Sequence, residues 1–180
     1  MGIEITSLKT LIESYKAENV SLSDLAEAFS SFHCKNNLDE ETFLKEKAID
    51  FELKNKARTY LVFDNDNIIA YFSLAFKSID LKNVSTNLKK KMTAGESCDT
   101  YPAFLIGHIA KNDNVPLKLG NILLDIANNL FYQAQLVVGG RLVYLDCKDI
   151  PKLRKFYENN GFKLFKQSET TGLLQYYKKL

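Results

Sequence analysis

The spacing of hydrophobic residues changes twice between residues 103 and 145. Residues 103–110 are almost continuously apolar, which is typical of a buried strand. A polar loop follows, and then a stripe at three- and four-residue spacing predicts a helix over residues 119–136; the stripe consists of Leu119, Ile122, Leu123, Ile126, Leu130 and Ala134. Residues 142–145 are again apolar and predict a central strand. Strand, helix and strand in this order predict a parallel pair joined by a crossover.

The loop before this helix is a candidate phosphate site. The first turn of a helix leaves backbone N–H groups without intrahelical partners, and the helix dipole favours negative charge there. Among the predicted strand-to-helix junctions, this one alone has a glycine, Gly120, in the first helical turn. We therefore expect a phosphorylated cofactor at the backbone amides of Leu117, Lys118, Leu119, Gly120 and Asn121.

The N-terminal third predicts a short edge strand and two helices. Residues 2–8 favour the strand. Helical spacing begins at Ser21, a plausible cap, and continues through Leu22, Leu25, Ala26, Phe29 and Phe32. A second helix, which begins near Asn37 or Asp39 and fades near Asn55, directs Phe43, Leu44, Ala48 and Phe51 to a core.

Residues 60–63 and 68–76 are rich in β-formers and predict a hairpin around residues 64–67. The aspartates of this turn do not require calcium, because Asx residues favour turns and the other ligands of a calcium loop are absent from the sequence. Residues 78–100 are polar and predict an insertion with a short helix around Leu88. Its run of lysines, residues 89–91, predicts either a solvated face or a nucleic-acid contact.

The C-terminal part predicts a short helix that begins at Pro151 and ends at Asn159, with Asn160-Gly161 as a left-handed cap. Strands around residues 162–166 and 173–177 follow. The whole chain is therefore mixed α/β, with antiparallel strands leading into a parallel segment. We expect one domain over residues 1–180.

Composition changes this picture little. The chain has 180 residues, 46% of them hydrophobic, and its net charge of +2 is too small to indicate nucleic acid by itself. It has no apolar run of the ~20 residues that span a bilayer and no signal sequence at its start, so we expect a cytoplasmic protein without a membrane partner. Cys34, Cys98 and Cys147 lie far apart without metal-ligand spacing, which indicates reduced thiols and no metal.

Several segments together resemble a known family. The sequences FLIGHIAKN, LKLGNILLDIANN, GGRLVYLDCKD and FYENNGF are similar to the GNAT acyltransferases, in particular to the toxin branch found in bacterial toxin–antitoxin pairs. The resemblance implies a strongly twisted mixed sheet with splayed central strands and flanking helices. It also implies that acetyl-CoA is the co-substrate, with its pantetheine along Ile109, Ala110 and Lys111 and its pyrophosphate at residues 117–121.

The resemblance implies direct transfer of an acetyl group to an amine, with Tyr157 as the acid that protonates the departing thiolate. A tyrosine suits this role because its ordinary pKa of ~10 is close to that of an alkyl thiol. The alternative from the residues alone is that Tyr157 packs in the core beside Phe156. Cys147 is expected to be structural, because direct transfer needs no covalent cysteine.

The sequence departs from the family in its phosphate loop. The family pattern Q/R-x-x-G-x-G/A aligns with residues 115–120, where Val115 replaces the leading residue and Lys118 replaces the first glycine. Pro116 also removes one backbone donor. The Lys118 ammonium supplies a charge that favours pyrophosphate. His108, where the toxin branch often has an arginine, is either a packed strand residue or a substrate contact.

Three hypotheses follow. The chain is a GNAT N-acyltransferase, or more specifically a toxin that acetylates aminoacyl-tRNA and is bound by an antitoxin, or an inactive GNAT-like binding or regulatory module. The toxin hypothesis needs a basic face. Six cations against two acids between residues 148 and 166 provide one, namely Lys148, Lys152, Arg154, Lys155, Lys163 and Lys166 against Asp149 and Glu158. A homodimer is compatible with each hypothesis.

Overall fold

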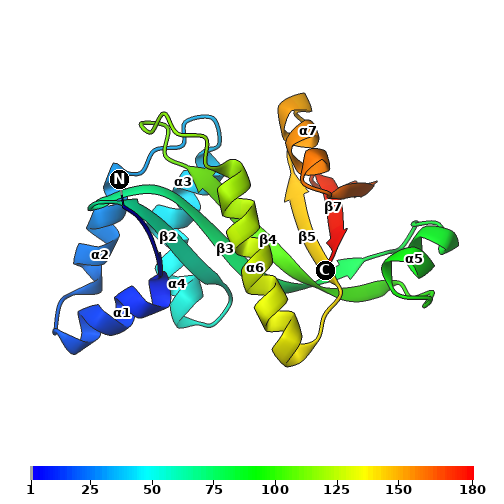
Figure 1. Cartoon of the computed structure of the whole chain (residues 1–180), viewed down its shortest axis with the longest axis horizontal. Helices are drawn as coiled ribbons and strands as arrows, with labels where there is room; N and C mark the ends of the chain where they lie inside the picture. The colour runs from blue at the N-terminus through cyan, green and yellow to red at the C-terminus, as the bar shows by residue number, and fades with distance from the viewer. Residues whose placement is uncertain (1) are drawn as a thin grey trace. The chain divides into compact units, whose positions relative to one another are not determined.

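The computed structural model describes residues 2–180 and divides into two compact units. The first contains the chain up to Ala75 together with His108–Leu123, and the second contains Phe76–Gly107 and Leu124–Leu180. Seven strands are hydrogen-bonded in the order β1-β2-β3-β4-β5-β7-β6 (Figure 1). They are β1 (Ile3–Ser7), β2 (Arg58–Asp64), β3 (Asn67–Asp80), β4 (Thr100–Lys111), β5 (Leu142–Cys147), β6 (Lys163–Gln167) and β7 (Leu174–Lys179). The predicted mixed α/β class is confirmed.

The first unit packs short helices against its strands. These are α1 (Leu8–Ala17), α2 (Leu22–Ala28), the 3-10 turn η1 (Phe29–Ser31), α3 (Leu38–Thr42), η2 (Phe43–Lys47) and α4 (Ala48–Leu53). The edge strand and the helix from Ser21 form as predicted, and the Ser21 hydroxyl caps α2 by accepting a hydrogen bond from the Ser23 amide. The core of this unit contains Leu8, Ile12, Phe29, Phe32, Phe43, Leu44, Leu61 and Tyr71.

Helix α1 is absent from the sequence-based prediction. Its apolar positions, Leu8, Leu11, Ile12 and Tyr15, follow helical spacing, so the pattern was present in the sequence. Ser7 begins the helix, because its side chain accepts a hydrogen bond from the Thr10 amide. The strand β1 therefore runs directly into a helix.

The helix predicted near Asn37–Asn55 forms, but it is not regular. Its middle segment η2 is a π-helical turn between α3 and α4. Near its end Glu52 is only 4% exposed; its carboxylate accepts hydrogen bonds from Arg58 Nη1 at 2.8 Å and from the Thr59 amide at 2.9 Å. This buried acid joins the end of α4 to the start of β2.

The predicted hairpin is β2 and β3, which pair from Arg58↔Leu74 to Asp64↔Asn67. Asn65, at the turn, has a φ of 52°, a left-handed conformation that asparagine tolerates. The turn is thus explained without a bound metal.

The second unit contains the other ends of β3 and β4, the strands β5, β6 and β7, and most of α6 (Gly120–Val138). Strand β3 extends to Asp80, and α5 (Thr86–Met92) is the short helix predicted around Leu88. Strands β4 and β5 are parallel, with Phe104↔Val143 and Leu105↔Tyr144 in register, which confirms the predicted crossover. β5, β7 and β6 pair antiparallel.

Helix α7 (Pro151–Asn159) follows β5, with proline in its first turn. It ends as predicted, because Gly161 has a φ of 82° and its amide donates to the Glu158 carbonyl. Within residues 2–180, none of the helices combines the length and apolarity that a membrane span requires.

Candidate functional site

The loop between β4 and α6 is held by one buried asparagine. Asn112 is 6% exposed, and its side-chain amide donates to the carbonyls of Ser31 at 3.2 Å and Ile68 at 3.1 Å. Its side-chain oxygen accepts a hydrogen bond from the Asn114 amide at 3.1 Å. Every polar atom of this side chain is therefore used to fix the start of the loop, which sequence analysis did not anticipate.

The loop has two further attachments. The Asp113 amide donates to the His33 carbonyl at 2.8 Å, and the Asp113 carboxylate accepts from the Lys35 amide at 2.7 Å. The Lys111 ammonium donates to the carbonyl oxygens of Asn112 and Val115. Because the ammonium of Lys111 is bound within the loop, only the backbone of this residue is available to a ligand.

Helix α6 begins at Gly120, where the Leu123 amide donates to the Leu119 carbonyl at 2.9 Å. Leu119 is buried and anchors the first turn, whereas Lys118 is exposed. Gly120 does not belong to the glycines with positive φ, so an L-residue could adopt its backbone. What Gly120 contributes is the absence of a side chain above the amides that open the helix.

All eight residues expected to hold the cofactor lie in the first unit. Ile109, Ala110 and Lys111 form the end of β4, and residues 117–121 form the junction with α6. The intervening loop is tied to β3 and to the segment after η1. The structure therefore joins the two groups by a short fixed connection.

We expect Lys118→Ala to weaken coenzyme A binding by about 1–3 kcal/mol, the range for a hydrogen bond to a charged group. The reason is that Lys118 presents an exposed ammonium in a phosphate loop that lacks its usual glycine. Calorimetric titration measures the change. Lys35→Ala, which removes another exposed ammonium outside the loop, is the control, and equal affinities for the two variants would contradict a role for Lys118.

His108 lies on β4 immediately before these residues, and its side chain is held on two sides. Nδ1 lies 2.9 Å from Oε2 of Glu40 on α3, and the imidazole stacks on the Phe43 ring with centroids 3.7 Å apart. The Tyr71 hydroxyl donates to the Glu40 carbonyl at 2.6 Å and to Glu40 Oε2 at 3.0 Å. Burial and the nearby Glu40 carboxylate raise the pKa of Tyr71, so its hydroxyl stays a donor.

The other histidine, His33, also lies beside an acid. Its Nδ1 is 3.5 Å from Glu41 Oε1, which also accepts from Lys45 Nζ at 2.6 Å. The Lys45 ammonium lowers the pKa of Glu41 to about 2, together with the hydrogen bond from the Cys34 amide. This cluster connects α3 to the segment that follows η1.

Tyr157 lies in the second unit, on α7, where it is 6% exposed. Its ring packs edge-on against Phe162 with centroids 5.9 Å apart, and against Tyr176 of β7 at 6.1 Å. The ring therefore belongs to the contact between α7 and the neighbouring strands. Its role as an acid stays a prediction.

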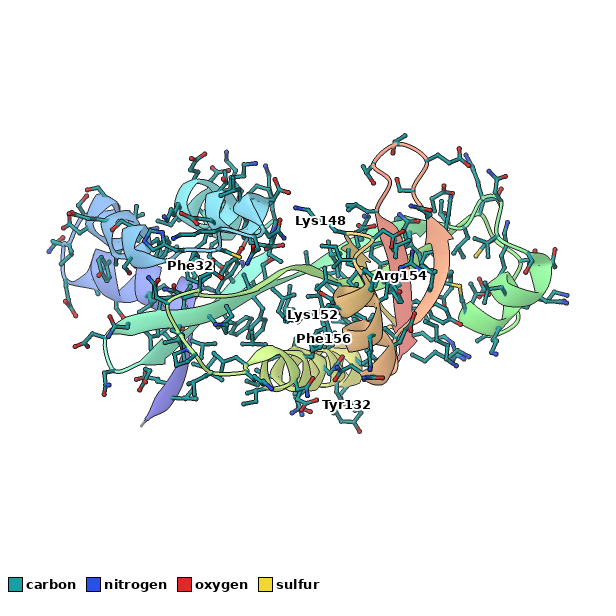
Figure 2. All side chains as sticks on the ribbon, turned by 90° about the horizontal axis from the view of Figure 1, so that it is seen from above. Phe32, Tyr132, Lys148, Lys152, Arg154 and Phe156 are labelled. Carbon is teal, nitrogen blue, oxygen red and sulfur yellow. The ribbon has the colours of Figure 1, made fainter. Side chains whose placement is uncertain are left out.

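Figure 2 shows Lys148, Lys152 and Phe156 along one side of α7, while Arg154 lies on the other. Arg154 pairs with Asp149, and Nε donates to the Asp149 carboxylate at 2.6 Å. Lys166, another cation of the predicted basic face, donates to Asp80 at 2.9 Å. Two cations of the predicted basic face, Arg154 and Lys166, are therefore paired with acids, which lowers the net positive charge of this face.

Strand β5 carries a polar network and a buried thiol. Burial raises the pKa of Cys147 to about 11, with Asp146 and Asp149 adding to the shift, so the thiol is a poor nucleophile, as a structural role requires. Lys77 Nζ lies 3.0 Å from Asp146, which also accepts a hydrogen bond from the Tyr144 hydroxyl. Sequence analysis missed this network, although Tyr144 and Asp146 are two residues apart and therefore point to the same face of the strand.

Among residues 2–180, no group of three or more potential ligands is placed to hold a metal ion.

A scan against protein families finds no match for the sequence. A search of curated proteins finds none either. Solved structures do resemble the chain. A tyrosine-to-phenylalanine variant of KacT has a TM-score of 0.71 at 18% identity, over 98% of this chain and 95% of that one. AtaTR bound with acetyl-CoA has a TM-score of 0.66 at 16% identity, over 96% and 91%.

AtaT complexed with acetyl-methionyl-tRNA is similar over 82% of this chain and 85% of that one, with a TM-score of 0.65 and 18% identity. The chain therefore has the GNAT fold, as the resemblance of its sequence implied. Its fold is in particular that of AtaT and KacT.

Proposed function

We propose that the protein transfers an acetyl group from acetyl-CoA to an amine, and that this amine is the amino group of an aminoacyl-tRNA. The observation that carries the proposal is the fold match to AtaT complexed with acetyl-methionyl-tRNA. The general class is supported independently by the strand, anchored loop and helix between Ile109 and Asn121, which suit a phosphorylated cofactor.

In this proposal the cofactor is held mainly by backbone. The end of β4, from Ile109 to Lys111, pairs with the amides of pantetheine, and the amides of residues 117–121 bind the pyrophosphate. The exposed Lys118 ammonium adds charge to the same phosphates. The Asn112 side chain keeps the connection rigid, so little entropy is lost when the cofactor binds.

Acyl transfer from a thioester needs an acid for the leaving thiolate, and we assign this role to Tyr157. Its ring is fixed by packing against Phe162 and Tyr176, which is what a positioned acid requires. The solved neighbours include forms of AtaT and KacT with a single tyrosine replaced by phenylalanine. The proposal also includes an antitoxin protein as a partner, because AtaT is found bound to the C-terminus of the antitoxin AtaR.

The experiment is an acetyl-transfer assay with radiolabelled acetyl-CoA and total tRNA. We expect label on aminoacylated tRNA. We expect none on tRNA that was deacylated in mild alkali before the reaction, because deacylation removes the aminoacyl group that carries the acceptor amine. The control for cofactor use is calorimetric titration with acetyl-CoA. Binding without transfer to any charged tRNA would contradict the proposed acceptor.

A second candidate is a GNAT-like module that binds without catalysis. The loop favours it, because Val115 and Pro116 stand where the family has a basic or amide residue and a backbone donor. This candidate predicts that acetyl-CoA binds weakly and is not hydrolysed or transferred to amines. The same assay separates it from the enzyme.

A further inference from the structure

The acceptor amine is protonated near neutral pH, since an α-amino group has a pKa of ~7.7–8.0, and it must lose a proton before it can attack a thioester. We propose that His108 is the general base of the reaction and that Glu40 positions it. This proposal rests on the proposed function. The residues that carry it lie in the first unit and come from α3, β3, β4 and η2.

The Glu40 carboxylate determines which nitrogen of His108 can accept a proton. Its Oε2 lies 2.9 Å from Nδ1, so Nδ1 carries the hydrogen and donates it to the carboxylate. Nε2 of the neutral ring then has an unshared electron pair. Within residues 2–180, Nε2 has no hydrogen-bond partner, and the side chain is 27% exposed.

The ring is also fixed against rotation. Its plane lies within 14° of the Phe43 ring at a centroid separation of 3.7 Å, and Tyr71 holds the carboxylate by donating to Glu40 Oε2 at 3.0 Å. A base whose orientation is set before the substrate arrives loses little entropy in the transition state. The neighbouring titratable groups are Glu40 on α3, Tyr71 on β3 and Cys34, whose pKa is raised by burial and by the charges of Asp113 and Glu40.

In the proposed binding mode of the cofactor, the direction of β4 puts His108 next to the thioester. The strand runs from Thr100 to Lys111, and the pyrophosphate loop follows its end. A pantetheine arm that leaves the pyrophosphate and pairs with residues 111 to 109 therefore runs backwards along the strand. Its thioester comes after Ile109 in that direction, which is the position of His108. Because side chains alternate, His108 projects from the opposite face to Ile109.

The step balances as follows. Nε2 of His108 takes one proton from the ammonium, and the amine nitrogen forms a bond to the thioester carbonyl carbon. The carbon–sulfur bond breaks, and the sulfur leaves with the electron pair. The amine nitrogen loses a second proton on forming the amide, and the thiolate gains one proton to become the thiol of coenzyme A. The products are the amide, coenzyme A and one proton, which the imidazole releases to water.

The test is His108→Gln, measured with acetyl-CoA and the charged tRNA that the wild type acetylates. We expect kcat to fall about 10²- to 10³-fold, which is a usual contribution of a positioned base. The affinity for coenzyme A should stay within twofold of the wild-type value. The matched control is His33→Gln, since His33 is the only other histidine and also lies beside a carboxylate. That variant should keep the wild-type kcat.

Two readouts separate a base from a packing residue. The deficit of His108→Gln should shrink as pH rises from about 6 to 9, because more of the amine is then neutral without a base. Added imidazole should partly rescue His108→Ala and should not change His33→Ala. Glu40→Gln keeps the volume and a hydrogen bond but loses the charge, and should lower kcat by about tenfold.

Each contrary result is decisive. If His108→Gln keeps its kcat, or if its deficit is independent of pH and imidazole has no effect, His108 is not the base. A misfolded His108→Gln leaves the rescue of His108→Ala and the kcat of Glu40→Gln as the deciding measurements. Failure of the proposed function looks different, because the wild type itself would then transfer no acetyl group to charged tRNA; this result overturns the present inference as well.

Discussion

Tyr157→Phe is expected to lower turnover by about 10²- to 10⁴-fold while the protein keeps its fold and its affinity for coenzyme A. The substitution removes one hydroxyl and retains the ring that packs against Phe162 and Tyr176. If the hydroxyl protonates the thiolate, its loss raises the barrier of the chemical step alone. Steady-state kinetics with the acceptor found for the wild type give kcat, and calorimetry gives the affinity.

The matched control for this experiment is Tyr176→Phe. Tyr176 is buried, its ring contacts Tyr157, and its hydroxyl lies 3.2 Å from Glu158 Oε1. Burial and this hydrogen bond raise the pKa of Tyr176 to about 12, which makes it a poorer acid than an ordinary tyrosine. The Tyr176→Phe variant should therefore keep the turnover of the wild type. Equal turnover of the two variants would make Tyr157 a packing residue.

Gly140→Ala is expected to destabilise the second unit by about 2–6 kcal/mol, the sum of a strained backbone and an overpacked core. Gly140 has a φ of 118°, which L-residues rarely adopt. A Cβ there would lie 2.5 Å from Cε2 of Phe104, a buried ring that contacts the rings of Phe76 and Phe131, each at 5.0 Å. Urea denaturation followed by circular dichroism measures the loss.

Gly139→Ala separates the two contributions to that loss. Gly139 also has a positive φ, 75°, but a Cβ there would meet nothing within 4 Å. This variant should cost only the left-handed backbone, about 1–2 kcal/mol. If the two variants were equally stable, the clash with Phe104 would contribute nothing to the loss of stability of Gly140→Ala.

The long elements of the fold could be predicted because each is periodic over many residues. The stripe from Leu119 to Ala134 and the apolar run before it are examples. Helix α1 was missed even though its spacing is helical, because it follows directly on a short strand whose own period is weak. The π-helical turn η2 could not be foreseen, because a single wide turn leaves no period of its own.

The candidate site divides in the same way. The cofactor residues could be named from the sequence because they lie close together along the chain, on either side of one loop. The pair of His108 and Glu40 is separated by 68 residues and depends on the docking of α3 on β4. Sequence analysis left His108 open between packing and substrate contact. The buried side chain of Asn112 was likewise hidden, because its partners Ser31 and Ile68 are distant in sequence.

The wide turn η2 has a consequence for the two acids at either end of its helix. Glu40 binds Tyr71 and His108, and Glu52 binds Arg58 and Thr59. In a regular helix, residues twelve apart point about 120° away from each other, since each residue turns the helix by about 100°. One surplus residue cancels most of that angle. If the same residues formed a regular helix without this turn, the helix could direct either carboxylate to the sheet, but not both.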